Sequence, residues 1–185
     1  MQAEASAIGS QAKYPRGVLN TLGLVACGAM IAYALYEQHV VGLEPCHLCI
    51  LQRVAVIALG VLFLAALLHA PRAAGARVYA ALFALVALAG MVAAGRHVWL
   101  QAQPPGTVPA CGADLGFMLK ILPLQTVLVK VFKGGAECQK VDWSLLGLSM
   151  PAWVFLALAA LGTCGVLANW PLRRAASSRS SVRRV

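Results

Sequence analysis

Two cysteines separated by two residues, Cys46 and Cys49, stand in the stretch EPCHLCILQR at the edge of an apolar segment. A C-x-x-C pair is typical of thiol–disulfide exchange, of a structural disulfide or of part of a zinc site. A structural disulfide with so short a loop constrains little chain entropy and is easily strained, and strained, exposed disulfides are the labile ones. The spacing therefore favours redox chemistry and leaves an inert disulfide and a metal site as alternatives.

Arg53 follows Cys49 by four residues, and the chain then becomes apolar from Val54 to Leu68. If a helix begins near Cys49, the guanidinium lies one turn away on the same face. The helix N-terminus adds partial positive charge at the thiol. Both effects stabilise a thiolate, which is the nucleophilic form of cysteine. The alternative is an arginine that extends its charge from the membrane to the water interface.

The other cysteines are of two kinds. Cys27 and Cys164 lie within apolar runs, where a thiol packs like any small apolar side chain, so we expect a structural role for them. Cys111 and Cys138 lie in a long segment between apolar runs and complete an even set with the C-x-x-C pair. Zinc would need ligands from two separate loops, and the second loop brings neither another C-x-x-C nor an H-x-x-x-H.

The segments that must position these cysteines are unusually apolar. The 185-residue chain is 61% hydrophobic and 11% charged, whereas soluble domains have about 45–50% apolar and about 25% charged residues. Apolar runs of about 20 residues cross the bilayer as helices. The sequence predicts an all-α membrane protein whose single domain, residues 1–170, is a bundle of four transmembrane helices. The expected spans are residues 18–36, 50–69, 78–100 and 151–170.

Basic residues predict the orientation. Nine flank the ends that four spans place on one side: Lys13, Arg16, Arg72, Arg77, Arg173, Arg174, Arg179, Arg183 and Arg184. Four lie in the second loop on the other side: Lys120, Lys130, Lys133 and Lys140. The imbalance favours cytoplasmic termini. We therefore expect the net charge of +9 to set the topology and to attract anionic lipids, and we expect no binding of nucleic acid. Residues 171–185 are expected to be a disordered cytoplasmic tail.

The N-terminal region has some features of a signal peptide, because Lys13 and Arg16 precede an apolar run that contains Ala32-Tyr33-Ala34. The run continues through Tyr36 and is long enough to span, so we expect it to be retained.

The segment 115–133 is apolar, carries scattered lysines and is interrupted by Pro123. It is too broken to cross a membrane. It could lie flat in the membrane interface or pack on the bundle, and the sequence does not decide between the two.

The combination of these features resembles one bacterial family. EPCHLCILQR at the mouth of the second span, two cysteines in a large second loop and the closing stretch DWSLLGLSMPAW are similar to the disulfide bond formation protein B family, DsbB. The resemblance covers nearly the whole chain. It implies a multi-pass protein of the bacterial inner membrane, a thiol:quinone oxidoreductase with both termini in the cytoplasm and its active cysteines on the periplasmic side.

The resemblance also implies a path for electrons. A Cys111–Cys138 disulfide would accept electrons from a periplasmic DsbA-like thiol oxidase, with Cys111 forming the mixed disulfide. The electrons would pass to Cys46–Cys49, through a transient bond between Cys46 and Cys138, and Cys49 would deliver them to a membrane quinone, ubiquinone or menaquinone. The position of the C-x-x-C pair then has a reason, because one substrate is in water and the other in lipid.

Two residues are candidates for quinone binding. Arg53 is one, and His97, in GRHVWLQ, matches by its placement a family histidine implicated at the quinone. It could donate a hydrogen bond to a quinone oxygen or supply a proton; a histidine at the membrane interface is the alternative. We expect Arg96 to be an interface anchor and assign no essential role to His47. No metal ligand is assigned, and the competing hypothesis is a metal-binding membrane protein that uses outer-loop cysteines and histidines.

Overall fold

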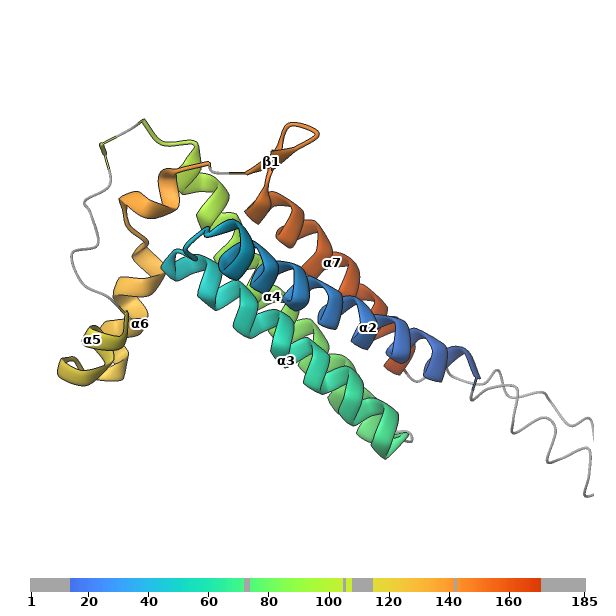
Figure 1. The fold of residues 1–185 in the computed structure, drawn as a ribbon. Helices are drawn as coiled ribbons and strands as arrows, with labels where there is room; N and C mark the ends of the chain where they lie inside the picture. The colour runs from blue at the N-terminus through green and yellow to red at the C-terminus, as the bar shows by residue number, and fades with distance from the viewer. Residues whose placement is uncertain (1–13, 72–73, 105, 108–114, 142, 171–185) are drawn as a thin grey trace, which may run out of the picture.

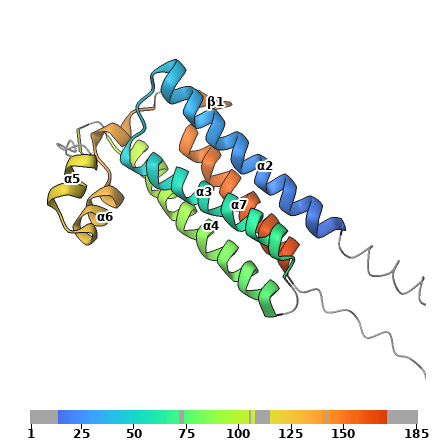
Figure 2. The ribbon, with the colours of Figure 1, turned by 60° about the horizontal axis from the view of Figure 1, so that its bottom comes forward.

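The computed structural model describes residues 14–71, 74–104, 106–107, 115–141 and 143–170. Four long helices lie side by side (Figures 1 and 2), and each is long and apolar enough to cross a membrane. They are α2 (Tyr14–Tyr36), α3 (His47–His69), α4 (Ala74–Gln101) and α7 (Met150–Asn169). The predicted all-α bundle of four membrane helices is confirmed.

The first turn of α3 is more polar than the apolar run that predicted it. The helix begins at His47, three residues before the expected start at Ile50, and Cys46 is its N-cap with extended backbone angles. The first α-helical bond joins the amide of Ile50 to the carbonyl of Cys46 at 3.2 Å. Hydropathy marks where the chain becomes apolar, whereas the helix also includes the turn that carries the C-x-x-C pair.

Small residues allow the helices to approach closely. Leu59 and Phe63 of α3, Phe83 of α4 and Leu158 of α7 are completely buried in the core. The rings of Phe63 and Phe83 lie 4.5 Å apart between centroids. The Phe83 ring fills the space where a side chain at Gly165 would begin. This packing is expected of membrane helices. No hydrophobic driving force acts between helices in lipid, so small residues allow the close van der Waals contact that holds them together.

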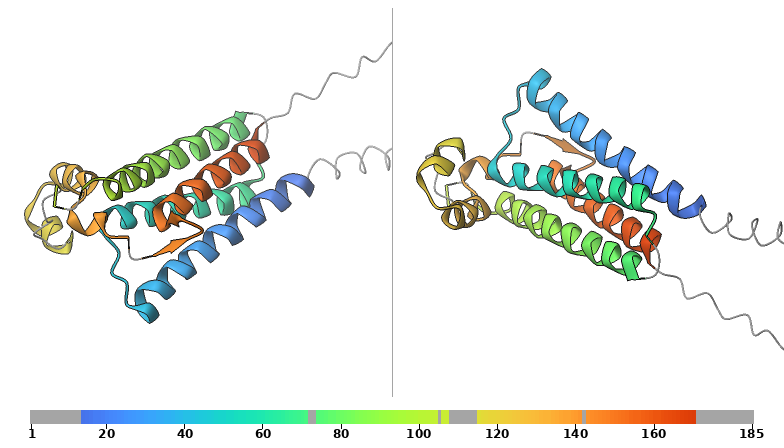
Figure 3. Two further views of the ribbon diagram at one scale, coloured as in Figure 1. Left: turned by 90° about the horizontal axis from the view of Figure 1, so that it is seen from above. Right: turned by 90° about the horizontal axis from the view of Figure 1, so that it is seen from below.

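Both chain ends of the bundle lie at the same end (Figure 3). The Nε of Arg16, near the start of α2, donates a 2.9 Å hydrogen bond to the carbonyl of Ala168, near the end of α7. One turn further in, the Nδ2 of Asn169 donates to the Oδ1 of Asn20 at 3.1 Å, and both side chains are buried. Lys13, Arg72 and residues 171–185 lie outside the described residues, so the disordered tail stays a prediction.

The opposite end of the bundle carries the two connections that contain the C-x-x-C pair and Cys138. α2 continues into a π-helical turn, η1 (Glu37–Val41), which ends at Gly42 with a φ of 81°. The second connection contains the short helices α5 (Leu115–Ile121) and α6 (Leu124–Lys133), the 3-10 helix η2 (Ala136–Gln139) and a hairpin of β1 (Ser144–Leu145) and β2 (Leu148–Ser149). The hairpin pairs Ser144 with Ser149 and Leu145 with Leu148.

The segment 115–133 packs through one face only. Val127 and Val131 of α6 are buried with Met118, and Leu51 of α3 packs against them. Other apolar side chains of the segment, among them Phe117 and Leu124, are more than half exposed. Packing on the bundle is confirmed, and an interfacial position for the exposed face stays a prediction.

Packing of α4 on α7 predicts a difference between two glycines. Gly165→Ala should destabilise the bundle by about 1–3 kcal/mol, because the added methyl group collides with the buried Phe83 ring. Gly28→Ala, in α2, is the matched control because nothing lies within 4 Å of its added methyl group. Thermal unfolding of both variants in detergent measures the difference, and equal stability would contradict this account of the packing.

Candidate active site

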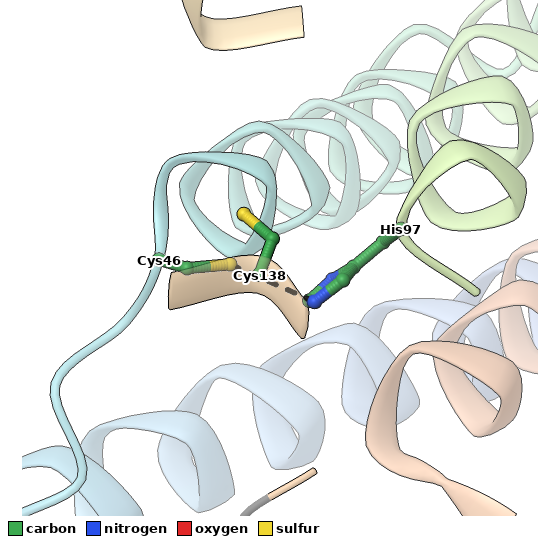
Figure 4. Close-up of side chains that lie close together, drawn as sticks. All are labelled: Cys46, His97 and Cys138. Atoms are coloured by element: carbon green, nitrogen blue, oxygen red, sulfur yellow. Dashed lines mark hydrogen bonds between the residues drawn. The ribbon is translucent and has the colours of Figure 1, made fainter. Parts of the chain in front are cut away.

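Three separate elements bring chemically active side chains together. Cys46 precedes the first turn of α3, His97 lies near the end of α4, and Cys138 lies in η2 (Figure 4). The sulfur atoms of the two cysteines and a ring nitrogen of His97 all lie within 4.8 Å of one another. The sequence placed these cysteines in different loops, and the fold makes them neighbours.

The C-x-x-C pair is in contact within itself. The Sγ atoms of Cys46 and Cys49 lie 3.3 Å apart, and both residues are free cysteines in this structure. Cys49 is in the first turn of α3, where backbone N–H groups have no partner within the helix and favour a negative charge. The Sγ of Cys46 therefore lies next to two other sulfur atoms, those of Cys49 and Cys138, with which it could form a disulfide.

Two side chains of α4 hold η2 in place from both sides. A guanidinium nitrogen of Arg96 donates to the carbonyl of Lys133 at 3.3 Å. The amide nitrogen of Gln101 donates to the carbonyl of Lys140 at 3.4 Å. These bonds fix the backbone before and after Cys138. Arg96, expected to be an interface anchor, also lies over the ring of Trp99, so its contacts connect α4 to the second connection.

The inner face of this connection is apolar and tightly packed. Leu48, Leu100 and Cys138 form a buried cluster with at most 1% exposure each. Gly134 lies against it with a φ of 70°, a conformation that favours glycine, and a side chain there would meet Leu100 and Leu48. The close approach of η2 to α3 therefore depends on a residue without a Cβ atom.

The environment of Cys138 keeps its thiol protonated. Contact with Cys46 and burial of the thiol raise the pKa of Cys138 above its usual range. A negative charge on Cys138 is thereby disfavoured when the cysteine is reduced.

Arg53 is paired within the bundle. One of its guanidinium nitrogens donates to the carbonyl of Ala34 at 3.0 Å, and the other donates to the side-chain oxygen of Gln38. These contacts tie α3 to the end of α2. Arg53 and Cys49 line the same cavity, which agrees with the expectation that they share a helical face.

His97 is buried, with 4% of its surface exposed. The side-chain nitrogen of Gln52 lies 3.2 Å from its Nδ1. An amide nitrogen can only donate, so Nδ1 accepts and the ring proton resides on Nε2. That Nε2 lies 3.7 Å from the Sγ of Cys46, and Nδ1 lies 3.9 Å from the Sγ of Cys49. His97 is thus directed at the C-x-x-C pair rather than located on an exposed surface.

Gln52 was not singled out from the sequence. A signal existed, because a glutamine beside Arg53 in an otherwise apolar helix must find a polar partner when it is buried. The side chain is 4% exposed, and the partner it finds is His97.

A cavity of about 340 Å³ adjoins the C-x-x-C pair. Polar side chains of Cys49, Arg53 and His97 line one part of it. Apolar side chains from α2, α3 and α7 line the rest, among them Met30, Ile31, Val56, Val154 and Ala157. A mostly apolar pocket of about 300–1,000 Å³ with a few convergent polar groups is typical of a small-molecule site.

The cluster of Cys46, His97 and Cys138 could also hold a soft metal ion, since two sulfurs and one imidazole are suitable donors. A closed structural zinc site takes four ligands, and within the described part of the chain this donor set offers three.

Comparisons with known proteins agree with this arrangement. A family model described as "Disulfide bond formation protein DsbB" matches residues 16–168. The chain belongs to the DsbB family. Three relatives carry the name "Disulfide bond formation protein B". The protein of Nitrosococcus oceani is 50% identical over 83% of this chain and 89% of the relative. That of Methylococcus capsulatus is 48% identical over 83% and 93%, and that of an Azoarcus species is 45% identical over 79% and 86%.

DsbB membership confirms the resemblance found in the sequence and makes this a multi-pass membrane protein of disulfide bond formation, with a redox role. Cys111 lies outside the described residues, so its pairing with Cys138 stays a prediction. Cys27 is buried in the helix core and Cys164 contacts α2, and neither lines the cavity.

The raised pKa of Cys138 predicts slow alkylation in the fully reduced protein. Thiolate is the reactive form, so Cys138 should react at least roughly tenfold more slowly at pH 8 than a cysteine of ordinary pKa. Its rate should still be rising above pH 9. Cys46→Ala should accelerate the reaction, because it removes the contact that raises the pKa, whereas Cys49→Ala leaves that contact in place. Peptide mass spectrometry after timed labelling measures the rates, and equal rates with and without Cys46 would refute this explanation.

Proposed function

We propose that the protein reoxidises a periplasmic DsbA-like thiol oxidase and passes the electrons through two disulfides to a membrane quinone. It is then a protein dithiol:quinone oxidoreductase that sustains disulfide bond formation. The observation that supports this most is the placement of Cys46, which contacts Cys49 beside the cavity and lies within 4.8 Å of Cys138. Cys46 thus lies between Cys138 of the second loop and Cys49, which lines the cavity.

The proposed exchange begins with disulfides Cys111–Cys138 and Cys46–Cys49. A thiolate of the partner attacks Cys111, which frees Cys138 as a thiolate. Cys138 attacks Cys46, so that a Cys46–Cys138 bond forms and Cys49 is freed. The partner's second thiolate displaces Cys111, and the partner leaves with its own disulfide. Cys111 then attacks Cys138, which restores their bond, frees Cys46 and leaves both electrons on the C-x-x-C pair.

The geometry supports the step between the loops. A disulfide needs its sulfurs about 2 Å apart, and the sulfurs of Cys46 and Cys138 are already within 4.8 Å. The bonds from Arg96 and Gln101 fix the backbone on both sides of Cys138. The two sulfur atoms are therefore neighbours before the exchange begins.

The cavity residues fit a quinone ring. Its two carbonyl oxygens need hydrogen-bond donors, and the guanidinium of Arg53 and the ring of His97 line the otherwise apolar cavity. A bound quinone would supply the acceptor for the two electrons and two protons that the Cys46–Cys49 dithiol gives up when its disulfide re-forms, and the product would be quinol. His97 holds a proton at Nε2 beside Cys46, and Arg53 keeps a positive charge near Cys49.

The redox order of the partners supports a quinone as acceptor. DsbA is established as a strong oxidant among thiol–disulfide proteins. Its reoxidant must accept electrons more readily still, and a lipid-soluble quinone is available where α3 enters the membrane. We place the site on the periplasmic face of the bacterial inner membrane, because Arg16 and Arg77 lie at the other end of the bundle.

The proposal is tested by anaerobic mixing of the purified protein, reduced DsbA-like partner and ubiquinone or menaquinone, with quinol formation followed by absorbance. Replacing Cys46, Cys49, Cys111 or Cys138 with Ser should abolish quinol formation, because each breaks the chain of exchanges. Cys27→Ser and Cys164→Ser are the matched controls and should retain it. Full quinol-forming activity of Cys49→Ser would refute the proposed function.

Arg53→Ala should impair the quinone step more than partner binding. We expect the KM for quinone to rise about tenfold or more, since hydrogen bonds from charged groups are worth about 1.5–3 kcal/mol. The affinity for the partner should change less than about twofold, because the guanidinium contacts the helix bundle and the cavity. Arg77→Ala, an exposed arginine in the first turn of α4, is the control. Unchanged quinone kinetics in Arg53→Ala would remove Arg53 from the site.

A second candidate is metal binding by Cys46, His97 and Cys138. It predicts stoichiometric metal in protein purified without chelators, with the outer cysteines reduced. Thiols that react with an alkylating reagent only after reduction would oppose it and favour the redox proposal.

A further inference from the structure

His47, the first spacer residue of the C-x-x-C pair, is buried but incompletely paired. Its side chain is 11% exposed, and its Nδ1 has no hydrogen-bond partner. The group facing this nitrogen is the carboxylate of Glu137, whose Oε2 lies 3.6 Å away and whose side chain is 48% exposed. A buried ring nitrogen without a hydrogen-bond partner is costly, so a slightly closer approach of this carboxylate would be favourable.

The two residues directly adjoin the cysteines that must exchange. His47 follows Cys46 at the start of α3, and Glu137 precedes Cys138 in η2. On the inner side, Leu48 and Cys138 are buried together against α4. His47 and Glu137 make the polar contact between the same two segments. The segments are therefore joined by an apolar contact and by a pair of groups that can carry opposite charges.

We propose that His47 and Glu137 form an inter-loop clasp that holds the Sγ of Cys46 next to the Sγ of Cys138 and so favours the disulfide between them. Both are positioning residues, since neither contacts a reacting sulfur in the exchange. The proposal rests on the proposed function for its purpose, but it concerns an equilibrium within this chain alone. It gives His47 a role that its place as a mere spacer did not suggest.

The physical effect of the clasp is on effective concentration. Two thiols in separate loops form a disulfide more readily when another contact between the loops restricts their relative motion. Because the clasp and the disulfide stabilise the same arrangement, each strengthens the other by the same factor. Loss of the clasp should therefore appear as a lower equilibrium constant for the Cys46–Cys138 bond.

The test uses the full chain with Cys49→Ala and Cys111→Ala, so that Cys46 and Cys138 are the outer cysteines left to pair. The protein is equilibrated in a series of glutathione buffers, and the Cys46–Cys138 disulfide is quantified by alkylation and peptide mass spectrometry. Either His47→Gln or Glu137→Gln should lower the equilibrium constant about two- to fivefold, the range expected for one partly exposed polar contact between side chains.

Exchange of the charges separates a clasp from a merely structural effect. His47→Glu alone should lower the constant further, because two carboxylates then face each other. His47→Glu combined with Glu137→Lys should restore it, and His47→Lys, which keeps a positive charge, should retain at least about half of it. Glu44→Gln, an exposed acid close to Cys46 in the sequence, and His39→Gln, an exposed histidine in η1, are matched controls that should leave it unchanged.

The clasp is overturned if both glutamine variants keep the parent's constant. It is also overturned if Glu44→Gln lowers the constant equally, since net charge alone would then explain the effect. A third contradicting result is a low equilibrium constant in both His47→Lys and the charge-exchange variant. The assay contains neither partner nor quinone, so its outcome is independent of quinol formation. A failure to form quinol would overturn the proposed function and leave the clasp standing.

Discussion

Packing of η2 against the first turn of α3 is the contact on which the site depends. Thiol–disulfide exchange is a reaction at bond length, so a cysteine that is merely in the same region of the protein cannot take part without rearrangement. Here Cys138 is completely buried beside Leu48 and Leu100. The absence of a side chain at Gly134 makes this close approach possible. The proposed exchange therefore depends on an apolar contact that includes Cys138 itself.

The bundle combines close packing with a cavity near its site end. In the core, Phe83 fills the space beside Gly165, and Arg16 and Asn20 join α2 to α7 at the end opposite the site. At the site end, side chains from all four long helices surround the cavity next to Cys49. Figures 2 and 3 show α5 and α6 of the second connection beyond the helix ends on this side. Cys138 of the second connection and the cavity within the bundle therefore both adjoin the C-x-x-C pair.

Polar groups within the bundle are few, and several of those at the site bond to one another. An unpaired polar group in an apolar region is costly, so each one restricts the conformations of its neighbours. Gln52 donates to His97, which orients Nε2 toward Cys46. Arg53 donates to α2 and to Gln38 of η1. These bonds set the positions of the groups around the cavity.

The sequence by itself determined the four helices, the location of the C-x-x-C pair at the head of the second one, and the family. These properties are local: hydropathy is summed over about 20 residues, and the spacing of Cys46, Cys49 and Arg53 lies within about two helical turns. α3 begins three residues before the expected span 50–69 because the apolar run begins later than the helix.

Only the tertiary structure decided which distant residues meet. The contact of Cys46 with Cys138, the pairing of Gln52 with His97 and the approach of Glu137 to His47 each join segments that lie far apart along the chain. No local pattern encodes them, because the path of the second connection depends on how well its apolar side chains fit against the ends of α3 and α4. The same fit decided that the segment 115–133 packs through Val127 and Val131.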